Sequence, residues 1–179
     1  RQYESYRCNK CGNVVELQNV GGGELHCCGE AMEMTTTNLT SVNLLKAFAG
    51  ESQARNKYEY FAKVAQKEGY RDIAEHFQRA ANNEKVHAKL ELALNNRMTT
   101  NSNEDFGNTI ENLKEAIAGE SFENTTMYPD FAQIAKDEGH KEAAKLFEGI
   151  GKIEVDHEAM FNSLLQRLEA DAEFKSEDE

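Results

Sequence analysis

Apolar residues recur every three or four positions from Val42 to about residue 170, whereas residues 1–36 show no such period. This spacing is typical of amphipathic helices that bury one face. It is interrupted by glycine near 69 and 139, and by a connection rich in Asn, Thr and Ser between them. The pattern predicts four helices, arranged as two hairpins in a bundle with one long connection. We place them at about 41–68, 71–96, 108–137 and 140–170.

Residues 1–36 are expected to form a domain of their own. All four cysteines of the chain lie here, among turn-forming glycines. Short alternating stretches at 13–17 and 24–26 predict small strands, and the polar segment 35–41 predicts a linker that ends in a helix cap. A module of about 35 residues cannot bury a sufficient core, so it needs additional stabilisation, such as a metal ion or disulfides.

The two predicted hairpins are copies of one another. Ala49-Gly-Glu-Ser recurs as Ala118-Gly-Glu-Ser, and Glu84-x-x-His recurs as Glu154-x-x-His. The offset between the copies is 69 residues for the first motif and 70 for the second, so one residue has been inserted in the third helix, near Pro129. An inserted residue is commonly absorbed as a π-bulge, often at a functional site.

Ionisable residues lie on the predicted buried faces of the second and fourth helices. Glu84 and His87 are three residues apart and share a face, as do Glu154 and His157. The apolar residues that we expect beside them on these faces are Ile73, Phe77, Ala80, Leu94, Phe147, Ile150, Phe161 and Leu164. A buried carboxylate is costly unless it is paired or binds a cation. We therefore expect a cation in the core.

Two further glutamates are predicted at the same height. Glu51 and Glu120 lie 18 and 19 residues before the turn glycine of their hairpin, and each Glu-x-x-His glutamate lies 15 residues after it. At about 1.5 Å per residue, all four carboxylates fall in one layer. This is the di-iron or di-manganese carboxylate arrangement of ferritin-like bundles. The predicted ligands are Glu51, Glu84, His87, Glu120, Glu154 and His157, whose donor types also suit zinc.

A fifth carboxylate breaks the symmetry of the repeat. Glu123 lies one turn after Glu120, where the first hairpin has Ala54. Our hypothesis is that one metal ion exchanges Glu123 for His87 when its redox state changes. Tyr58 and Tyr128 lie two turns beyond Glu51 and Glu120. They are either core aromatics with a satisfied hydroxyl or residues that hydrogen-bond a ligand.

The cysteines are arranged as Cys8-x-x-Cys11, then fifteen residues, then Cys27-Cys28. With no secretion signal, such a set favours a metal site over disulfides. Tetrahedral thiolate coordination suits both iron and zinc, so the spacing leaves both open. The expected fold is mainly α: a ferritin-like four-helix bundle over 37–179 with a small β-type four-cysteine metal domain over 1–36.

Charge and hydropathy exclude several kinds of partner. The formal net charge is -12 and no basic cluster interrupts it, which disfavours nucleic acid and anionic membranes. No apolar run approaches the roughly 18 residues of a membrane span, and the N-terminus lacks a signal pattern. We expect a cytoplasmic protein. Arg1 is not an initiator methionine, so we expect the natural start to lie upstream.

Two families are recognisable in these motifs. Residues 6–15, residues 21–30 and Met32 closely resemble desulforedoxin and the N-terminal domain of desulfoferrodoxin, a family with one Fe(Cys)4 centre. The remainder resembles rubrerythrin in the segments 49–58, 84–87, 119–123, 127–129 and 154–157. The combination is similar to the desulforubrerythrins.

The resemblance implies a peroxidase for oxidative-stress defence, which reduces hydrogen peroxide to water at two iron ions in the bundle. Electrons would pass through one iron in the four-cysteine site, from an external donor protein or reductase, and between subunits of a homo-oligomer, either a dimer or a tetramer. The implied metal ligands are Cys8, Cys11, Cys27, Cys28, Glu51, Glu84, His87, Glu120, Glu123, Glu154 and His157. The implied catalytic residues are Tyr58, Tyr128, Glu123 and His87.

One departure from the family is expected to matter. Most rubrerythrins carry a rubredoxin domain after the bundle, whereas this sequence stops at Glu179. Either a C-terminal rubredoxin domain is missing from this chain, or the N-terminal domain alone supplies the electrons. We favour the first alternative, because desulforubrerythrins resemble a three-part arrangement.

Three other functions stay open at this point. A ferritin-like ferroxidase or iron-handling protein would share the carboxylate and histidine set, but would need neither Glu123 nor a redox domain. A sensor or structural protein could hold zinc at the cysteines. A di-manganese catalase would not require a one-electron relay.

Overall fold

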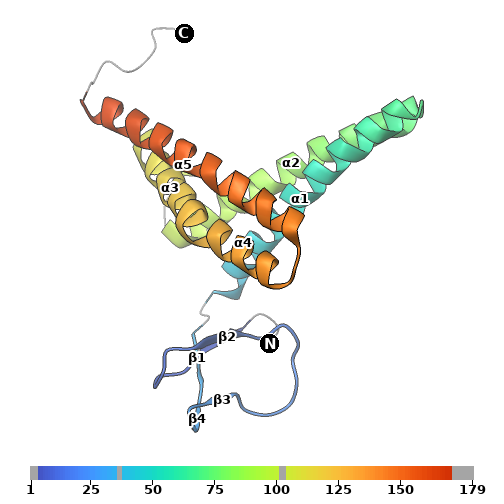
Figure 1. Cartoon of the computed structure of the whole chain (residues 1–179). Coiled ribbons are helices and arrows are strands. Elements are labelled where there is room, and N and C mark those ends of the chain that lie inside the picture. Colours follow the sequence, from blue (N-terminus) through green and yellow to red (C-terminus); the bar gives the residue numbers. More distant parts are fainter. Residues whose placement is uncertain (1–3, 36–37, 101–103, 171–179) are drawn as a thin grey trace. The chain divides into compact units, whose positions relative to one another are not determined.

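The structure is a computed structural model that describes residues 4–35, 38–100 and 104–170 (Figure 1). The chain forms two compact units, Arg1–Asp105 and Phe106–Glu179. The first contains a small β domain and one helical hairpin, and the second contains the other hairpin. No helix in the described parts is long and apolar enough to cross a membrane.

The β domain consists of five very short strands: β1 (Ser5–Arg7), β2 (Val14–Glu16), β3 (His26–Cys27), β4 (Glu30–Ala31) and β5 (Glu33–Met34). Antiparallel pairing joins them into a three-stranded sheet in the order β2-β1-β5 and a separate β3-β4 ribbon. The predicted strands at 13–17 and 24–26 correspond to β2 and β3. Between residues 4 and 35, only Cys8 is buried, at 2% exposure. A cysteine therefore occupies the place of an apolar core.

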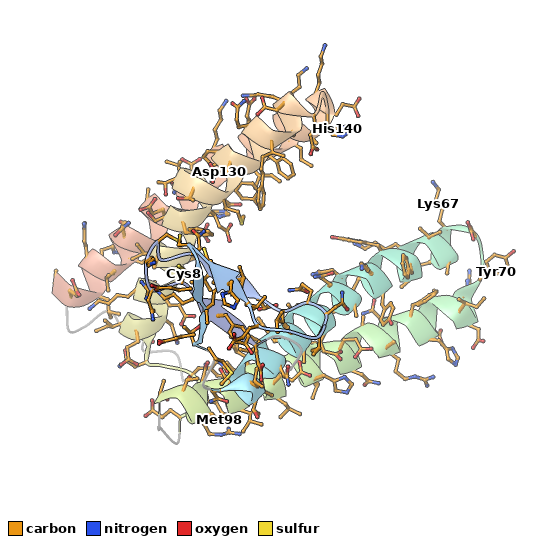
Figure 2. The ribbon with its side chains drawn as sticks, turned by 90° about the horizontal axis from the view of Figure 1, so that it is seen from below. Cys8, Lys67, Tyr70, Met98, Asp130 and His140 are labelled. Atoms are coloured by element: carbon orange, nitrogen blue, oxygen red, sulfur yellow. The ribbon has the colours of Figure 1, made fainter. Side chains whose placement is uncertain are left out.

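The first hairpin is formed by α1 (Leu39–Lys67) and α2 (Arg71–Thr100). The side chain of Asn38 caps α1 by accepting a hydrogen bond from the backbone N–H of Ser41 at 3.1 Å. Figure 2 shows the two helices side by side, from the turn marked by Lys67 and Tyr70 toward Met98. The line of contact between the helices is built from small residues, the buried alanines Ala62, Ala65, Ala81, Ala88 and Ala93.

The second hairpin contains the interruption that the repeat predicted. Its first arm consists of α3 (Thr109–Phe122), a π-helical turn η1 (Glu123–Met127) and α4 (Tyr128–Asp137), and its second arm is α5 (Lys141–Ala170). The π turn ends two residues before Pro129, which lies in the first turn of α4. The predicted π-bulge is therefore confirmed. The inserted residue widens one turn, so the flanking turns keep the register of the first hairpin.

The predicted buried faces are partly wrong. Ile73 is 48% exposed and Leu94 is 41% exposed, and none of the eight apolar residues expected there is fully buried. Two helices by themselves bury only the narrow line of side chains between them. The alanines occupy that line, and the larger residues lie beside it.

The turn glycines suggest a stability test. Gly139 has a φ of 83° at the end of α4, and its N–H donates to the carbonyl of Lys136 at 3.0 Å. We expect Gly139→Ala to lower the free energy of unfolding by about 1–2 kcal/mol, because an L side chain is strained in this left-handed conformation. Gly139→Asn should lose less, since Asn tolerates it. Urea unfolding followed by helical circular dichroism measures the difference, and equal losses would contradict the explanation.

Candidate metal centres

Two tight turns present the four cysteine sulfurs. Cys8 follows β1, and its carbonyl accepts a hydrogen bond from the N–H of Gly12 at 2.9 Å, which closes the turn that carries Cys11. Cys27 ends β3, and Cys28 lies in the turn toward β4. Cys28 has a φ of 55° and is the only non-glycine residue with positive φ in the described chain. That conformation costs about 1–2 kcal/mol, a strain typical of functional sites.

The sulfur positions fit one tetrahedral metal ion. The Sγ atom of Cys27 lies 3.6 Å from that of Cys11 and 3.9 Å from that of Cys28, and all four sulfurs lie within 4.8 Å of one another. A metal ion with four thiolates at about 2.3 Å has sulfur–sulfur edges of about 3.8 Å. A disulfide would need about 2 Å, and all four cysteines are free.

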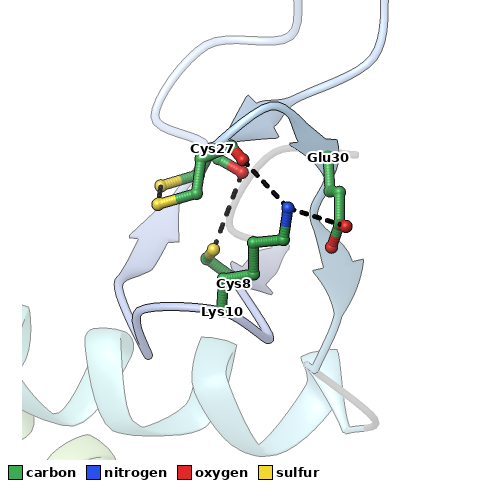
Figure 3. Close-up of polar contacts among 5 residues, drawn as sticks. Cys8, Lys10, Cys27 and Glu30 are labelled. Carbon is green, nitrogen blue, oxygen red and sulfur yellow. Dashed lines mark hydrogen bonds and ion pairs between the residues drawn. The ribbon is translucent and has the colours of Figure 1, made fainter.

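The polypeptide around the sulfurs holds the two turns together. Lys10 donates a hydrogen bond to the carbonyl of Cys28 at 3.4 Å and forms an ion pair with Glu30 at 2.8 Å (Figure 3). The thiol of Cys8 lies 3.7 Å from the carbonyl of Cys27, which it faces as a donor. Both turns are thus connected independently of any ion between the sulfurs.

The thiols of the cluster differ in their pKa values. The backbone N–H of Cys11 lowers the pKa of Cys8 to about 7 by donating to its sulfur. Hydrogen bonds with Cys11 and Cys27, and their negative charge, raise the pKa of Cys28 to about 12. A cation that binds four thiolates must displace these protons, so its binding is coupled to proton release.

The first hairpin brings Glu51 of α1 together with Glu84 and His87 of α2. The Nδ1 atom of His87 lies 2.8 Å from Oε2 of Glu84 and 3.5 Å from Oε2 of Glu51. One ligand atom from each residue lies within 4.8 Å of the others. We call this group the first triad.

The second hairpin repeats this geometry atom for atom. Nδ1 of His157 lies 2.6 Å from Oε2 of Glu154 and 3.5 Å from Oε2 of Glu120. These three residues, the second triad, again offer ligand atoms within 4.8 Å of one another. The structure therefore assembles each half of the predicted ligand set. That both triads share one metal pair stays a prediction from the repeat.

The electrostatics of the triads favour a bound cation. The hydrogen bond with Glu84 raises the pKa of Glu51, and the carboxylate of Glu84 raises the pKa of His87. Burial and then the hydrogen bond with Glu154 raise the pKa of Glu120. Oε2 of Glu120 is also buried without a hydrogen-bond partner among the described residues. Two carboxylates and one imidazole thus face each other with an unsatisfied oxygen, a donor set that fits a divalent metal.

Glu123 and Tyr128 interact electrostatically with the second triad, whereas Tyr58 belongs to α1 of the first hairpin. Glu123 is the first residue of the π turn, and it is outside the second triad. Burial raises the pKa of Tyr128, and the negative charges of Glu123, Glu154 and Glu120 raise it further. Tyr58 packs against Phe61 and Phe77, with ring centroids 6.3 and 6.2 Å apart. Neither tyrosine hydroxyl makes a hydrogen bond to the described residues, so a satisfied core hydroxyl is not observed.

A glycine that the motifs did not reveal determines the position of Tyr128. A Cβ on Gly151 of α5 would lie 3.1 Å from the Cβ of Tyr128, so a larger residue would displace this ring. The equivalent position in the first hairpin is Ala81. A position-by-position comparison of the two copies in the sequence could have found this difference. Beside Tyr128 lies an open cavity of about 560 Å³, which Phe147 and Gly151 also line.

The rubrerythrin family profile matches residues 43–165. The chain belongs to the rubrerythrin family. A second profile, that of the desulfoferrodoxin N-terminal domain, matches residues 1–35. The chain is therefore a rubrerythrin-family protein with an N-terminal desulforedoxin-like domain.

The sequences of three relatives support this assignment. A putative rubrerythrin of Methanocaldococcus jannaschii is 44% identical over 152 residues, covering 77% of this chain and 74% of the relative. The rubrerythrin of Porphyromonas gingivalis is 44% identical over 145 residues, with coverages of 78% and 72%. The desulfoferrodoxin of Nitratidesulfovibrio vulgaris is 58% identical over 33 residues, with coverages of 18% and 26%. A structure of fully reduced nigerythrin aligns at 31% identity and a TM-score of 0.37, covering 76% of this chain and 71% of the other.

Both predicted kinds of metal site agree with this membership. A rubrerythrin-family chain with this N-terminal domain has a carboxylate di-iron site and an Fe(Cys)4 site, and the triads and the cysteine cluster provide residues that fit them. The assignment of individual ligands stays a prediction, as does the boundary between the domains at 36 and 37.

Replacing two of the four cysteines tests the cysteine site independently of the metal site in the bundle. We expect the double variant Cys27→Ser, Cys28→Ser to lose one of three iron atoms per chain together with the visible absorption of ferric thiolate, while its helical circular dichroism is unchanged. His26→Asn, which alters an exposed neighbour of Cys27, is the matched control and should keep three. Metal analysis of anaerobically purified protein measures this. Full retention of iron and colour in the double variant would refute the cysteine assignment.

Proposed function

We propose that this protein reduces hydrogen peroxide to water and that electrons reach the bundle through the four-cysteine site. The single observation that supports this most strongly is the presence, in one chain, of a four-cysteine cluster and two matching carboxylate–histidine triads. Thiolate iron sites serve one-electron transfer, and oxygen and imidazole donors suit iron that reacts with oxygen species.

The chain's own residues hold and orient the reactants. When bound, the paired iron ions supply the two electrons and the positive charge that cleavage of the O–O bond requires. The raised pKa of Tyr128 keeps its hydroxyl protonated, so it can donate a hydrogen bond to a peroxide oxygen. A role of Glu123 as the exchangeable carboxylate is supported by its position at the start of the π turn and by its charge, which contributes to the raised pKa of Glu120. The reaction consumes two electrons and two protons for each peroxide and releases two waters.

The supply of electrons completes the proposal. An external donor protein or reductase reduces the four-cysteine iron, which passes one electron at a time to the bundle of another subunit in a homo-oligomer, a dimer or a tetramer. The reaction takes place in the cytoplasm. Ferroxidase activity, the alternative, uses the same triads but gives no role to the cysteine domain, and this difference can be tested.

The kinetics of the cysteine variant test the relay. In Cys27→Ser, Cys28→Ser, chemically reduced protein should still consume one peroxide per di-iron site in a single turnover, because the two electrons are already present. Steady-state turnover from a protein donor should fall about tenfold or more, because the variant lacks two thiolates of the site through which we propose that the electrons pass. Both rates are measured on the same sample, with His26→Asn as control. Parent rates in both assays would remove the cysteine domain from the pathway.

A second variant tests the exchangeable carboxylate. Glu123→Ala should keep most of the bundle iron, because both triads remain, but its oxidised absorption spectrum and its cycling with peroxide should change. Glu123→Gln keeps the size of the side chain and isolates the effect of charge. Unchanged spectra and unchanged turnover in both variants would reject the exchange of Glu123 for His87.

A further inference from the structure

The π turn of the second hairpin is linked to the opposite arm by a side-chain hydrogen bond. Nδ2 of Asn124, the second residue of η1, donates to Oε2 of Glu158 on α5 at 2.6 Å, and both residues are half-buried. The hydroxyl of Thr125 in the same turn instead donates to the carbonyl of Ser121 at 2.5 Å, within its own arm. In the described chain, Asn124 therefore makes the one side-chain hydrogen bond between η1 and α5.

The first hairpin has no equivalent of this link. The repeat places Arg55 and Ala88 at the two corresponding positions. Arg55 forms an ion pair with Glu59 of its own helix at 3.4 Å, and Ala88 is one of the buried alanines between α1 and α2. The link is thus confined to the copy that also has the π turn and the spare carboxylate of Glu123.

The two linked residues each lie next to a predicted metal ligand. Asn124 directly follows Glu123, and Glu158 directly follows His157. The charge of Glu123 contributes to the raised pKa of Glu120, so its carboxylate lies near the second triad, yet it is outside the group whose ligand atoms are within 4.8 Å of one another. The position of η1 against α5 therefore decides how far this carboxylate is from the triad.

The direction of the Glu123 side chain depends on where the wide turn lies. The N–H of Tyr128 donates to the carbonyl of Glu123, and α-helical turns flank this π turn on both sides. If the wide turn moved along the arm past Glu123, that side chain would rotate by about 100° around the helix axis. The close approach of Gly151 to Tyr128 fixes the far end of the turn. The hydrogen bond of Asn124 holds the near end, at the residue next to Glu123.

We propose that Asn124 is a positioning residue, whose hydrogen bond with Glu158 holds the π turn against α5 and so directs the Glu123 carboxylate toward the second triad. This role rests on the proposed function, in which Glu123 is the exchangeable carboxylate. Asn124 also lines the cavity beside Tyr128. A direct contact between Asn124 and a reactant in that cavity is the competing explanation, and the experiments separate the two.

The absorption spectrum of the oxidised, iron-loaded full chain tests the role without peroxide. Asn124→Ala and Glu158→Ala each remove one end of the link, and both should change the spectrum in the same direction as Glu123→Ala, with iron content unchanged. Glu158→Gln keeps an acceptor oxygen and should keep the parent spectrum. Asn162→Ala is the matched control, because its half-buried amide donates within α5, to the carbonyl of Glu158 at 3.0 Å. A parent spectrum in Asn124→Ala would overturn the proposal.

A double-mutant cycle tests whether Asn124 acts through Glu123. In single-turnover assays, Asn124→Ala should slow peroxide consumption by about threefold to tenfold, as expected for the loss of one hydrogen bond. In the Glu123→Ala background it should have no further effect, because the group that it positions is gone. Equal slowing in both backgrounds would overturn the proposal in favour of a direct contact in the cavity.

Hydrogen exchange followed by mass spectrometry measures the turn itself. The peptide that contains residues 123–128 should exchange faster in Asn124→Ala than in the parent, and at the parent rate in Asn162→Ala. Unchanged exchange in Asn124→Ala would overturn the anchoring of the turn. A parent that consumes no peroxide would reject the proposed function, whereas the spectra and the exchange rates would still decide the role of Asn124.

Discussion

Carboxylates that are withdrawn from water need a positive charge, and this constraint shapes both hairpins. Each hairpin turns two glutamates and a histidine toward one another, and the second leaves a glutamate oxygen buried without a partner. Such an arrangement is unfavourable for a structure that only has to be stable, because apolar residues of similar size would cost less. It is favourable for a chain that binds a divalent metal, which supplies the missing charge. The buried alanines between α1 and α2 allow the two helices to approach closely. Their small side chains let the helices lie close enough for Glu51 to reach His87.

The β domain meets the same constraint with different donors. Its strands are two or three residues long, and Cys8 is its only buried side chain between residues 4 and 35. Without a metal ion, the thiols compete for protons, and the pKa values of Cys8 and Cys28 move in opposite directions. One ion bound to four thiolates removes this competition and holds the two turns together. Both kinds of site therefore offer groups that a metal ion would stabilise, the thiols in the β domain and the carboxylates in the hairpins.

The two copies of the hairpin differ at residues close to their triads. The π turn, Glu123 and Gly151 belong to the second copy, and they place a spare carboxylate and a closely packed tyrosine beside its triad. Glu91 and Asn95 belong to the first copy, whereas the second copy has Phe161 and Leu165 at the equivalent positions. A duplicated metal-binding hairpin provides symmetric ligands, and these residues break that symmetry. The asymmetric residues are thus the ones that the ligand motifs alone leave unexplained.

Much of this could be predicted from the sequence, because its signals are local. The helical period predicted the four helical segments, and the motif spacing placed Glu84 beside His87 and Glu154 beside His157. The one-residue offset between the copies predicted a π-bulge near Pro129, and the structure has it at 123–127. Contacts between helices depend on side-chain volume and on which face meets which, and these are not local. The periodicity therefore assigned Ile73 and Leu94 to a buried face, whereas alanines form the seam and both larger residues are exposed. Only the tertiary structure revealed the buried oxygen of Glu91 and the contact between Gly151 and Tyr128, because whether a polar atom finds a partner is decided by the neighbouring helix and not by its own segment.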